Sequence, residues 1–288
     1  MHIEPFFDPH SSTLTYLVHD GREGIVIDPV RDYDPRNGHT SWASSERVAA
    51  FADRLGLRIP YAIDTHVHAD HMTGLPFFAE RYGSRTVTGA RVGAVQRTFR
   101  DLYDLGADFP VDGSQFDLRV DEGKRLRFGS LEALALDTPG HTPAHMSWRI
   151  GDAIFLGDTL FTPDYGTARC DFPGGSATEL YDSIQRLYAL PDETRLFMCH
   201  DYRPNGRPLV WQSTVGEQKR HNVQLDARTT REQFVAFRAR RDAELAAPEL
   251  ILPSLQVNVR AGRLPEPARN GIVYLKIPLD VLGKGGAG

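Results

Sequence analysis

Apolar and polar residues alternate along the chain with two different periods. A period of two, or a short unbroken apolar run, indicates a strand, and apolar residues three or four apart indicate a helix. The expected strands lie at residues 13–18, 24–28, 59–63, 86–88, 114–136, 145–150, 152–156 and 195–198. The expected helices lie at residues 44–55, 73–82, 90–105, 176–190, 211–222 and 230–246. Strand groups thus alternate with helices in both halves, which is typical of a layered α/β protein.

No proline- or serine-rich linker divides the chain, and no repeat of fixed length is present. We therefore expect one folded unit that ends in an extension packed on it. The last six residues, GKGGAG at 283–288, have the composition of a disordered tail.

Composition narrows the classes of protein. Apolar residues make up 41% of the 288 and charged residues 25%, which is ordinary for a globular protein with a core. The net charge of −5 argues against a nucleic-acid surface. The start has neither the basic nor the apolar region of a signal peptide, and no apolar run is long enough to span a membrane. With only Cys170 and Cys199 present, a reducing compartment such as the cytoplasm is expected.

Histidines concentrate in one short stretch. Residues 64–71 read DTHVHADH and hold three of the chain's 11 histidines with two aspartates. The stretch directly follows the expected strand at 59–63, so it lies on the loop that leaves this strand. Packing so many titratable groups together without a cation costs free energy. The sequence therefore predicts a metal site here.

Three further candidate ligands follow expected strands. His141, Asp158 and His200 each lie where a strand ends, and ligands of α/β proteins gather at such ends. Taken alone, His141 or His200 would be interpreted as a surface or core histidine without a ligand role. Together with the histidine cluster, each is a candidate metal ligand. Imidazole and carboxylate suit Zn, Fe or Mn, whereas a soft thiolate site would need cysteines.

The histidine cluster and these strand ends resemble one known family. His66-Val-His68-Ala-Asp70-His71 is similar to the HxHxDH signature of the metallo-β-lactamase superfamily. TPGHT at 138–142, GDT at 157–159 and His200 resemble its other ligand motifs, in the same order. The resemblance implies a four-layer αββα sandwich with the metal site at one sheet edge. It implies a catalytic domain at residues 1–204 and a C-terminal extension at 205–288 packed on the same domain.

Two branches of this family share the motifs. Glyoxalase II is a dinuclear hydrolase of glutathione thioesters, whereas the persulfide dioxygenases hold one Fe(II) and oxidise glutathione persulfide to sulfite with O2. The segments GTARCDFPGG at 166–175, CHDY at 199–202 and STVGEQKRHN at 213–222 resemble the dioxygenase branch. The chain is most similar to its bacterial β-lactamase-like hydrolase subgroup, which is linked to sulfide detoxification. Cys170 departs from the pattern, because other members can carry a hydroxyl residue there.

The resemblance also implies roles for the ligand-type residues. One Fe(II) per chain would be held by the catalytic residues His66, His141 and Asp158, with Zn as the alternative metal. In the dioxygenase interpretation four residues would surround the ligands, and in the hydrolase interpretation the same four would hold a second metal. These four residues are His68, Asp70, His71 and His200.

Substrate-binding residues are expected to be basic or hydroxyl-bearing, because glutathione carries two carboxylates and one ammonium. Arg169 is the first candidate, with an ion pair to Asp171 as its alternative role. Tyr202 is expected to hydrogen-bond the peptide or an oxygen at the metal, or else to be a core tyrosine. Lys219 and Arg220 lie on an expected helix that would cover the cleft, with a solvated helix face as the alternative.

Neighbouring polar residues are expected to support the site. His145 should brace it through a hydrogen bond, and Asp64 could orient a histidine. The expected partners are glutathione persulfide and O2, without nucleic acid or membrane, and family members are often homodimers. A non-catalytic persulfide sensor is the third alternative, against which the complete set of seven ligand-type residues argues.

Overall fold

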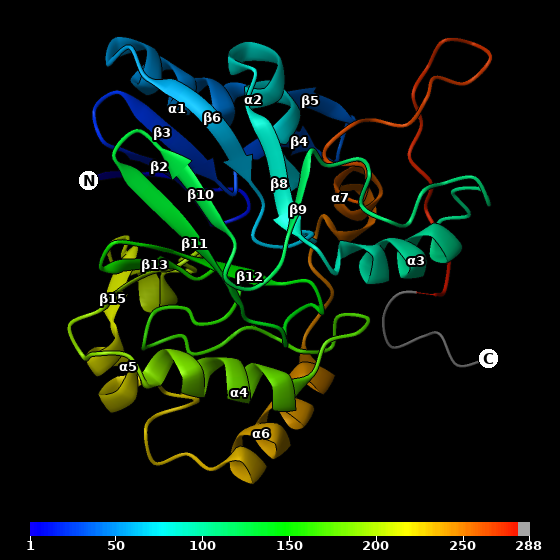
Figure 1. Ribbon diagram of the computed structural model, residues 1–288. Coiled ribbons are helices and arrows are strands. Elements are labelled where there is room, and N and C mark those ends of the chain that lie inside the picture. The colour runs from blue at the N-terminus through cyan, green and yellow to red at the C-terminus, as the bar shows by residue number, and fades with distance from the viewer. Residues whose placement is uncertain (282–288) are drawn as a thin grey trace.

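The computed structural model describes residues 1–281, and the tail at 283–288 for which we expected disorder lies outside them. Two six-stranded sheets face each other, and helices cover the outer face of each (Figure 1). The chain therefore folds as a four-layer αββα sandwich, and the predicted layer arrangement is confirmed.

The first sheet comes from the N-terminal half of the chain. Its strands, in spatial order, are β1 (His2–Asp8), β2 (Thr13–His19), β3 (Glu23–Ile27), β6 (Arg58–Ile63), β8 (Arg85–Gly89) and β9 (Leu118–Val120). The first three pair antiparallel, and β3, β6, β8 and β9 run parallel. The helices packed against its outer face are α1 (Ala43–Arg54), α2 (Leu75–Tyr82), α3 (Val92–Leu102) and α7 (Ile251–Asn258).

The second sheet comes from the C-terminal half. Its strands, in spatial order, are β10 (Arg125–Phe128), β11 (Leu131–Asp137), β12 (Met146–Ile150), β13 (Ala153–Phe155), β14 (Arg195–Phe197) and β15 (Gln212–Thr214). Only the β13–β14 pair is parallel. Its outer face is covered by α4 (Ala177–Tyr188), α5 (Val215–His221) and α6 (Arg231–Glu244). A small sheet of β5 (His39–Ser41), β4 (Val30–Asp34) and β7 (Met72–Thr73) and a short 3-10 helix, η1 (Pro204–Gly206), complete the elements.

The main core lies between the two sheets. Tyr16 from the first sheet packs edge-on against Phe155 and Phe197 from the second, with ring centroids 5.1 and 5.6 Å apart. Trp148 is fully buried in the same layer. The residues that alternate inward along each strand form this layer, which explains why the period-two pattern was readable in the sequence.

The loops at one edge of the sandwich carry the candidate ligands. The segment at 64–71 follows β6 in the first sheet, and His141, Asp158 and His200 follow β11, β13 and β14 in the second. Because these strands end at the same edge, residues far apart in the sequence meet there.

Two terminal elements were not expected from the sequence. The strand β1 contains Pro5, which is tolerated because β1 is an edge strand. The helix α7 contains Pro253 in its first turn, where no backbone N–H is needed for the helix. The expected helix at 211–222 begins only at Val215, because residues 212–214 pair with β14.

The part of the chain after residue 204 packs against both helical layers. Phe234 of α6 is buried with α4 on the second sheet, and Leu255 of α7 is buried on the first. None of the helices within residues 1–281 is both long and apolar enough to cross a lipid bilayer.

Candidate metal centre

His66, His141 and Asp158 converge from three loops. Their donor atoms lie within 4.8 Å of one another, and all three residues are buried. Asp158 Oδ2 is 4.0 Å from His66 Nε2 and 3.7 Å from His141 Nε2. The two imidazole rings stand perpendicular with centroids 5.0 Å apart. Two imidazole nitrogens and one carboxylate in this arrangement can bind a transition-metal ion on one face and leave its other positions open.

The chemistry of these donors fits a metal ion. Burial, together with the neighbouring His68, holds the pKa of His66 well below its usual value, so the ring is neutral. Among the described residues, Nε2 of His66 has no hydrogen-bond partner although it is fully buried, which is costly unless a ligand satisfies it. His141 donates its Nδ1–H to the carbonyl of Arg169 at 2.8 Å, which leaves the Nε2 lone pair facing the cluster.

His68 belongs to a different group of side chains. Its Nε2 lies 2.9 Å from Oδ1 of Asp28, and both residues are buried. Burial acts to lower the pKa of His68, but the charge and hydrogen bond of Asp28, together with the charges of Asp64 and Asp70, outweigh it and raise that pKa to about 9. The possible metal-ligand atom of His68 groups with those of Asp70 and His71, or with those of Asp28 and Asp64. It does not group with those of His66, His141 and Asp158.

A second cluster adjoins the first. His200 Nε2 lies 3.4 Å from Asp70 Oδ2 and 3.3 Å from Asp158 Oδ1. Within residues 1–281, the Nε2 atoms of His71 and His200 find no hydrogen-bond partner. Asp158 therefore lies between the two clusters, with one oxygen toward each. This arrangement has donors for a second ion.

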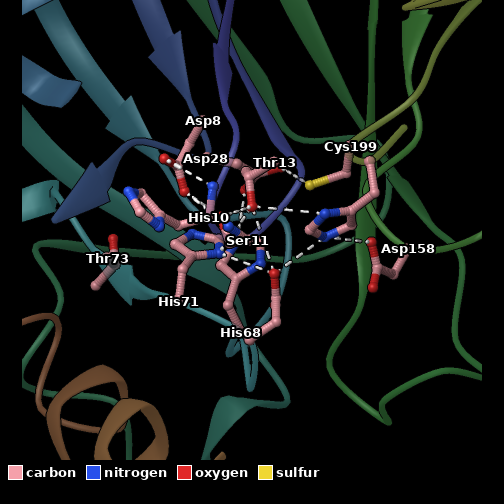
Figure 2. A network of polar contacts seen from close by, with 12 residues as sticks. Asp8, His10, Ser11, Thr13, Asp28, His68, His71, Thr73, Asp158 and Cys199 are labelled. Carbon is pink, nitrogen blue, oxygen red and sulfur yellow. Dashed lines mark hydrogen bonds and ion pairs between the residues drawn. The ribbon is translucent and has the colours of Figure 1, made fainter. Parts of the chain in front are cut away.

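Hydroxyl groups connect the second cluster to a buried carboxylate, Asp8 (Figure 2). Thr13 Oγ1 lies 3.3 Å from His71 Nδ1 and 3.5 Å from His200 Nδ1. It also lies 2.7 Å from Ser11 Oγ, which donates to Asp8 at 2.6 Å. Thr13 Oγ1 also lies 3.4 Å from Asp70 Oδ2, so this one hydroxyl contacts three members of the second cluster and helps to orient both imidazole rings.

His145 braces the site, as expected. Its Nδ1 lies 2.9 Å from Thr138 Oγ1, and its ring stacks on that of His66 with centroids 5.0 Å apart. Gly157 has a φ of +55°, and a Cβ there would overlap Nε2 of His145 and Oγ1 of Thr65. A glycine before Asp158 is therefore required for this close approach.

Of the two aspartates that end strands beside the site, Asp28 bonds a histidine, whereas Asp64 accepts a hydrogen bond from Thr73 Oγ1 at 2.8 Å. Burial raises the pKa of Asp64 to about 8. Asp28 also accepts the backbone N–H of Thr65 at 2.7 Å, so it fixes the start of the histidine loop. The role that we expected for Asp64 therefore falls to Asp28.

Two of the cavities in the described part of the chain reach His141. One of about 590 Å³ reaches Asp158 and is lined by the polar side chains of Tyr165, Tyr202 and Arg241. The other, of about 900 Å³, lies between α6 and residues 169–177 and has mainly apolar walls. His141 and Arg169 line both cavities.

The structure brings two of the four expected substrate-binding residues to the cavities. Arg169 lies in the wall, where its guanidinium makes two hydrogen bonds to Asp171, at 2.6 and 2.7 Å, and one to the Ala246 carbonyl. Tyr202 is 39% exposed, and its ring stacks on that of His200 with centroids 5.5 Å apart. Its hydroxyl can therefore meet a ligand from the polar cavity.

The other two lie elsewhere. Lys219 and Arg220 are on α5, where both pair with Asp192. Neither lines either of the two cavities at the centre. This agrees with the alternative of a solvated helix face.

No local sequence signal marks Thr13, Arg241 or Asn258 as part of the site. Thr13 contacts the cluster from β2, and Asn258 reaches the histidine loop from α7. Arg241 lines the polar cavity from α6. Each is brought to the centre only by the packing of distant elements.

Comparison with known proteins places these residues in a family. The model of the metallo-beta-lactamase superfamily matches residues 9–200. A probable metallo-hydrolase of Burkholderia pseudomallei is 49% identical over 98% of this chain and its own full length. The mitochondrial persulfide dioxygenase ETHE1 of Homo sapiens is 31% identical over 90% of this chain and 88% of that protein.

The solved structures agree with the sequence matches. The crystal structure of ETHE1 from Myxococcus xanthus superposes with a TM-score of 0.73 and 32% identity, over 91% of this chain and 100% of that one. The matched residues 9–200 contain all seven ligand-type side chains, from His66 to His200. The chain belongs to the metallo-beta-lactamase superfamily, and its relatives include persulfide dioxygenases and hydrolase-like proteins.

Proposed function

We propose that the chain is a non-haem iron persulfide dioxygenase that oxidises glutathione persulfide to sulfite. One Fe(II) per chain is held by His66, His141 and Asp158. The observation that carries the proposal is the composition of this three-donor group, which contains two histidines and one carboxylate and does not include His68. The likeness to persulfide dioxygenases at 31% and 32% identity supports it.

The bound iron supplies open coordination positions and the electron transfer that reaction with O2 requires. The chain supplies geometry and charge. His66 is kept neutral by burial, and the Arg169 carbonyl fixes the tautomer of His141. Glutathione persulfide, O2 and water give glutathione and sulfite, with release of protons.

The polar cavity suits the organic part of this substrate. Its volume of about 590 Å³ is within the usual range for small-molecule sites. Arg241 offers a cation for a substrate carboxylate, and the hydroxyls of Tyr165 and Tyr202 offer hydrogen bonds. Arg169, already paired with Asp171, positions the wall and adds positive charge near the centre.

A dinuclear hydrolase of glutathione thioesters is the second candidate. The buried Nε2 atoms of His71 and His200 favour it, because among the described residues they have no hydrogen-bond partner and could bind a second ion. Asp70 Oδ2 lies 3.3 Å from His71 Nδ1 and 3.4 Å from His200 Nε2. The similarity to a probable metallo-hydrolase is also compatible with it. The two functions differ in metal count and in O2 consumption.

The test is elemental analysis of protein purified without air, followed by O2-electrode and sulfite measurements with glutathione persulfide. One iron per chain and equal amounts of O2 consumed and sulfite formed are expected. His71→Ala should keep its iron, and His39→Ala, which changes an exposed histidine on β5, is the control. Two zinc ions per chain with thioester hydrolysis and no O2 uptake would replace this proposal by the hydrolase. Persulfide binding without turnover of either substrate would indicate a sensor.

A further inference from the structure

The C-terminal extension reaches the metal centre through two buried polar side chains. Both lie outside residues 9–200, the segment that the family model matches. Asn258 on α7 is 1% exposed, and Asp242 on α6 is 7% exposed. Burying a polar side chain costs free energy unless its hydrogen bonds are made, so the partners of these two residues indicate what they do.

Asn258 uses its whole amide on the histidine loop. Its Nδ2 donates to the carbonyls of His68 and His71, both at 2.8 Å. Its Oδ1 accepts the backbone N–H of Thr73 at 2.9 Å. Three hydrogen bonds from one planar group thus fix the backbone from 68 to 73, which carries the second half of the HxHxDH motif.

The helix that carries Asn258 is held firmly in the core. Leu255 and Val259, on either side of it, are fully buried among the residues between the first sheet and its helices. The side chain of Gln96 on α3 donates to the Val259 carbonyl at 3.0 Å. The position of the amide is therefore set by the packing of α7 in the core.

Asp242 acts on the other half of the centre through one peptide group. Its Oδ2 accepts the N–H of Cys170 at 2.9 Å. The carbonyl of that same peptide group belongs to Arg169 and accepts the Nδ1–H of His141 at 2.8 Å. The peptide plane between 169 and 170 therefore connects Asp242 directly to a candidate ligand.

The carboxylate of Asp242 is itself fixed. Its other oxygen pairs with Arg238, one turn earlier on α6, which is 2% exposed. The guanidinium of Arg238 also donates to Gln224 Oε1 at 3.0 Å. Within the described residues, this buried network reaches His141 by hydrogen bonds through the peptide group described above, and Arg238 and Asp242 also line the cavities beside the centre.

We propose that Asn258 and Asp242 are positioning residues that set the geometry of the metal centre from the C-terminal extension. Asn258 fixes the loop of the first sheet, and Asp242 fixes His141 on the second. The inference rests on metal binding at the cluster, as proposed above, but not on the reaction that the metal performs. Loss of a group that orients a metal ligand typically lowers metal affinity about 10- to 100-fold.

The test uses the full-length protein and Co²⁺, whose visible absorption reports ligand geometry, in competition with a chelator. Asn258→Asp keeps the acceptor for Thr73 but removes both donors, and Asn258→Ser removes the amide without adding a buried charge. Asn258 bonds the carbonyls of His68 and His71, which are not among the three proposed ligands, so its effect passes through the loop that also carries His66. Either variant is therefore expected to bind Co²⁺ more weakly by about 10-fold, the lower end of the range for positioning groups, and to change the absorption spectrum. If Asn258→Asp does not fold, Asn258→Ser decides by the same criterion.

A second set of variants tests Asp242 on α6 with two substitutions. Asp242→Ala removes the acceptor for the Cys170 N–H and should weaken Co²⁺ binding, whereas Asp242→Asn keeps an acceptor oxygen and should restore most of it. Thermal melting of the metal-free variants reports any general loss of stability separately.

Gln256→Ala is the matched control for α7. Gln256 is also buried on this helix, but its amide bonds Lys276 and the Leu252 carbonyl instead of the histidine loop. It should bind Co²⁺ within about twofold of the unchanged protein, which is well below the effect expected for a positioning residue. Equal Co²⁺ affinity in the Asn258 variants, or an equal loss in Gln256→Ala, would overturn the inference. An unchanged protein that binds no divalent metal would instead overturn the proposed function.

Discussion

His68 Nε2 and Asp28 Oδ1 lie 2.9 Å apart at the buried edge where the two sheets meet. The second histidine of the HxHxDH motif is therefore paired with a carboxylate of the protein itself. Asp28 has a φ of +51°, an unusual conformation for a residue other than glycine, which the surrounding structure must hold in place.

This pair predicts a pH dependence for the metal-free protein. The pKa of His68 is raised to about 9, against about 6.5 in an unfolded chain. The folded chain holds the proton of His68 more tightly than the unfolded chain does. The contribution of the His68–Asp28 pair to folding stability is therefore fully present below about pH 6.5 and is lost as the pH rises through 9. Chemical denaturation of the metal-free protein should therefore show a falling free energy of unfolding across this range. His68 contributes a slope of at most about 1.4 kcal/mol per pH unit, and Asp64, whose pKa is raised to about 8, adds to the decline below that pH.

Asp28→Asn is the matched variant for this measurement. It removes the charge that raises the pKa of His68, so the decline between pH 6.5 and 9 should become smaller. NMR titration of the metal-free protein should show the pKa of His68 moving downward in the variant. A pKa of His68 that is ordinary before the substitution contradicts the prediction.

Gly140 directly precedes His141 and has a φ of +139°. A Cβ there would overlap the backbone of Leu180 in the first turn of α4. Gly140→Ala should therefore displace His141 or α4, lower the free energy of unfolding by more than the approximately 1–3 kcal/mol of an unfavourable backbone conformation, and reduce metal content.

Gly123→Ala controls for backbone conformation alone. Gly123 has a φ of +81°, but no atom lies within 4 Å of the place that a Cβ would take there. Denaturation curves and metal analysis of the two variants separate the effects. Equal stability losses, with metal retained in both, would show that α4 does not constrain the His141 loop.

Arg169→Ala tests the wall of the substrate cavities. We expect the KM for glutathione persulfide to rise several-fold while iron content stays unchanged, because a cation near the substrate carboxylates is lost. Asp171→Asn, which removes the partner charge but keeps the guanidinium, should change KM less. An equal rise in both variants would show that Arg169 acts through its ion pair rather than on the substrate.

The two thiols should be unreactive in the folded protein. Both cysteines are buried and unpaired. Burial raises the pKa of Cys170 to about 12 and that of Cys199 well above its usual value, so little thiolate is present at neutral pH. A thiol-specific colorimetric reagent should detect almost no thiol in the native protein and two after denaturation. Rapid reaction of one thiol would show that the segment around it opens.

The sequence was most informative where local chemistry and local structure coincide. The HxHxDH segment follows a strand whose apolar run is readable alone, and the other ligands follow strands in the same way. The strand ends that carry the candidate ligands then meet, because the two sheets of the sandwich share that edge. Elements that depend on tertiary packing, such as β1 with its proline, were missed because edge pairing overrides local preference.

Contacts between distant segments could not be predicted from the sequence. Asn258 and His68 are 190 residues apart. Nothing in the sequence around Asn258 distinguishes it from an asparagine on the exposed face of a helix. The partner of His68 was also unpredictable, because Asp28 and Asp64 both end strands beside the site and only the folded geometry distinguishes them.

The placement of the three proposed ligands on loops of two different sheets has a thermodynamic consequence. A metal ion held by these three residues would cross-link the two halves of the sandwich, so separating the sheets would require releasing it. Binding to the folded chain alone raises the midpoint of thermal unfolding as free iron increases. Under iron starvation the population of unfolded chains would grow, and proteolysis would remove them faster.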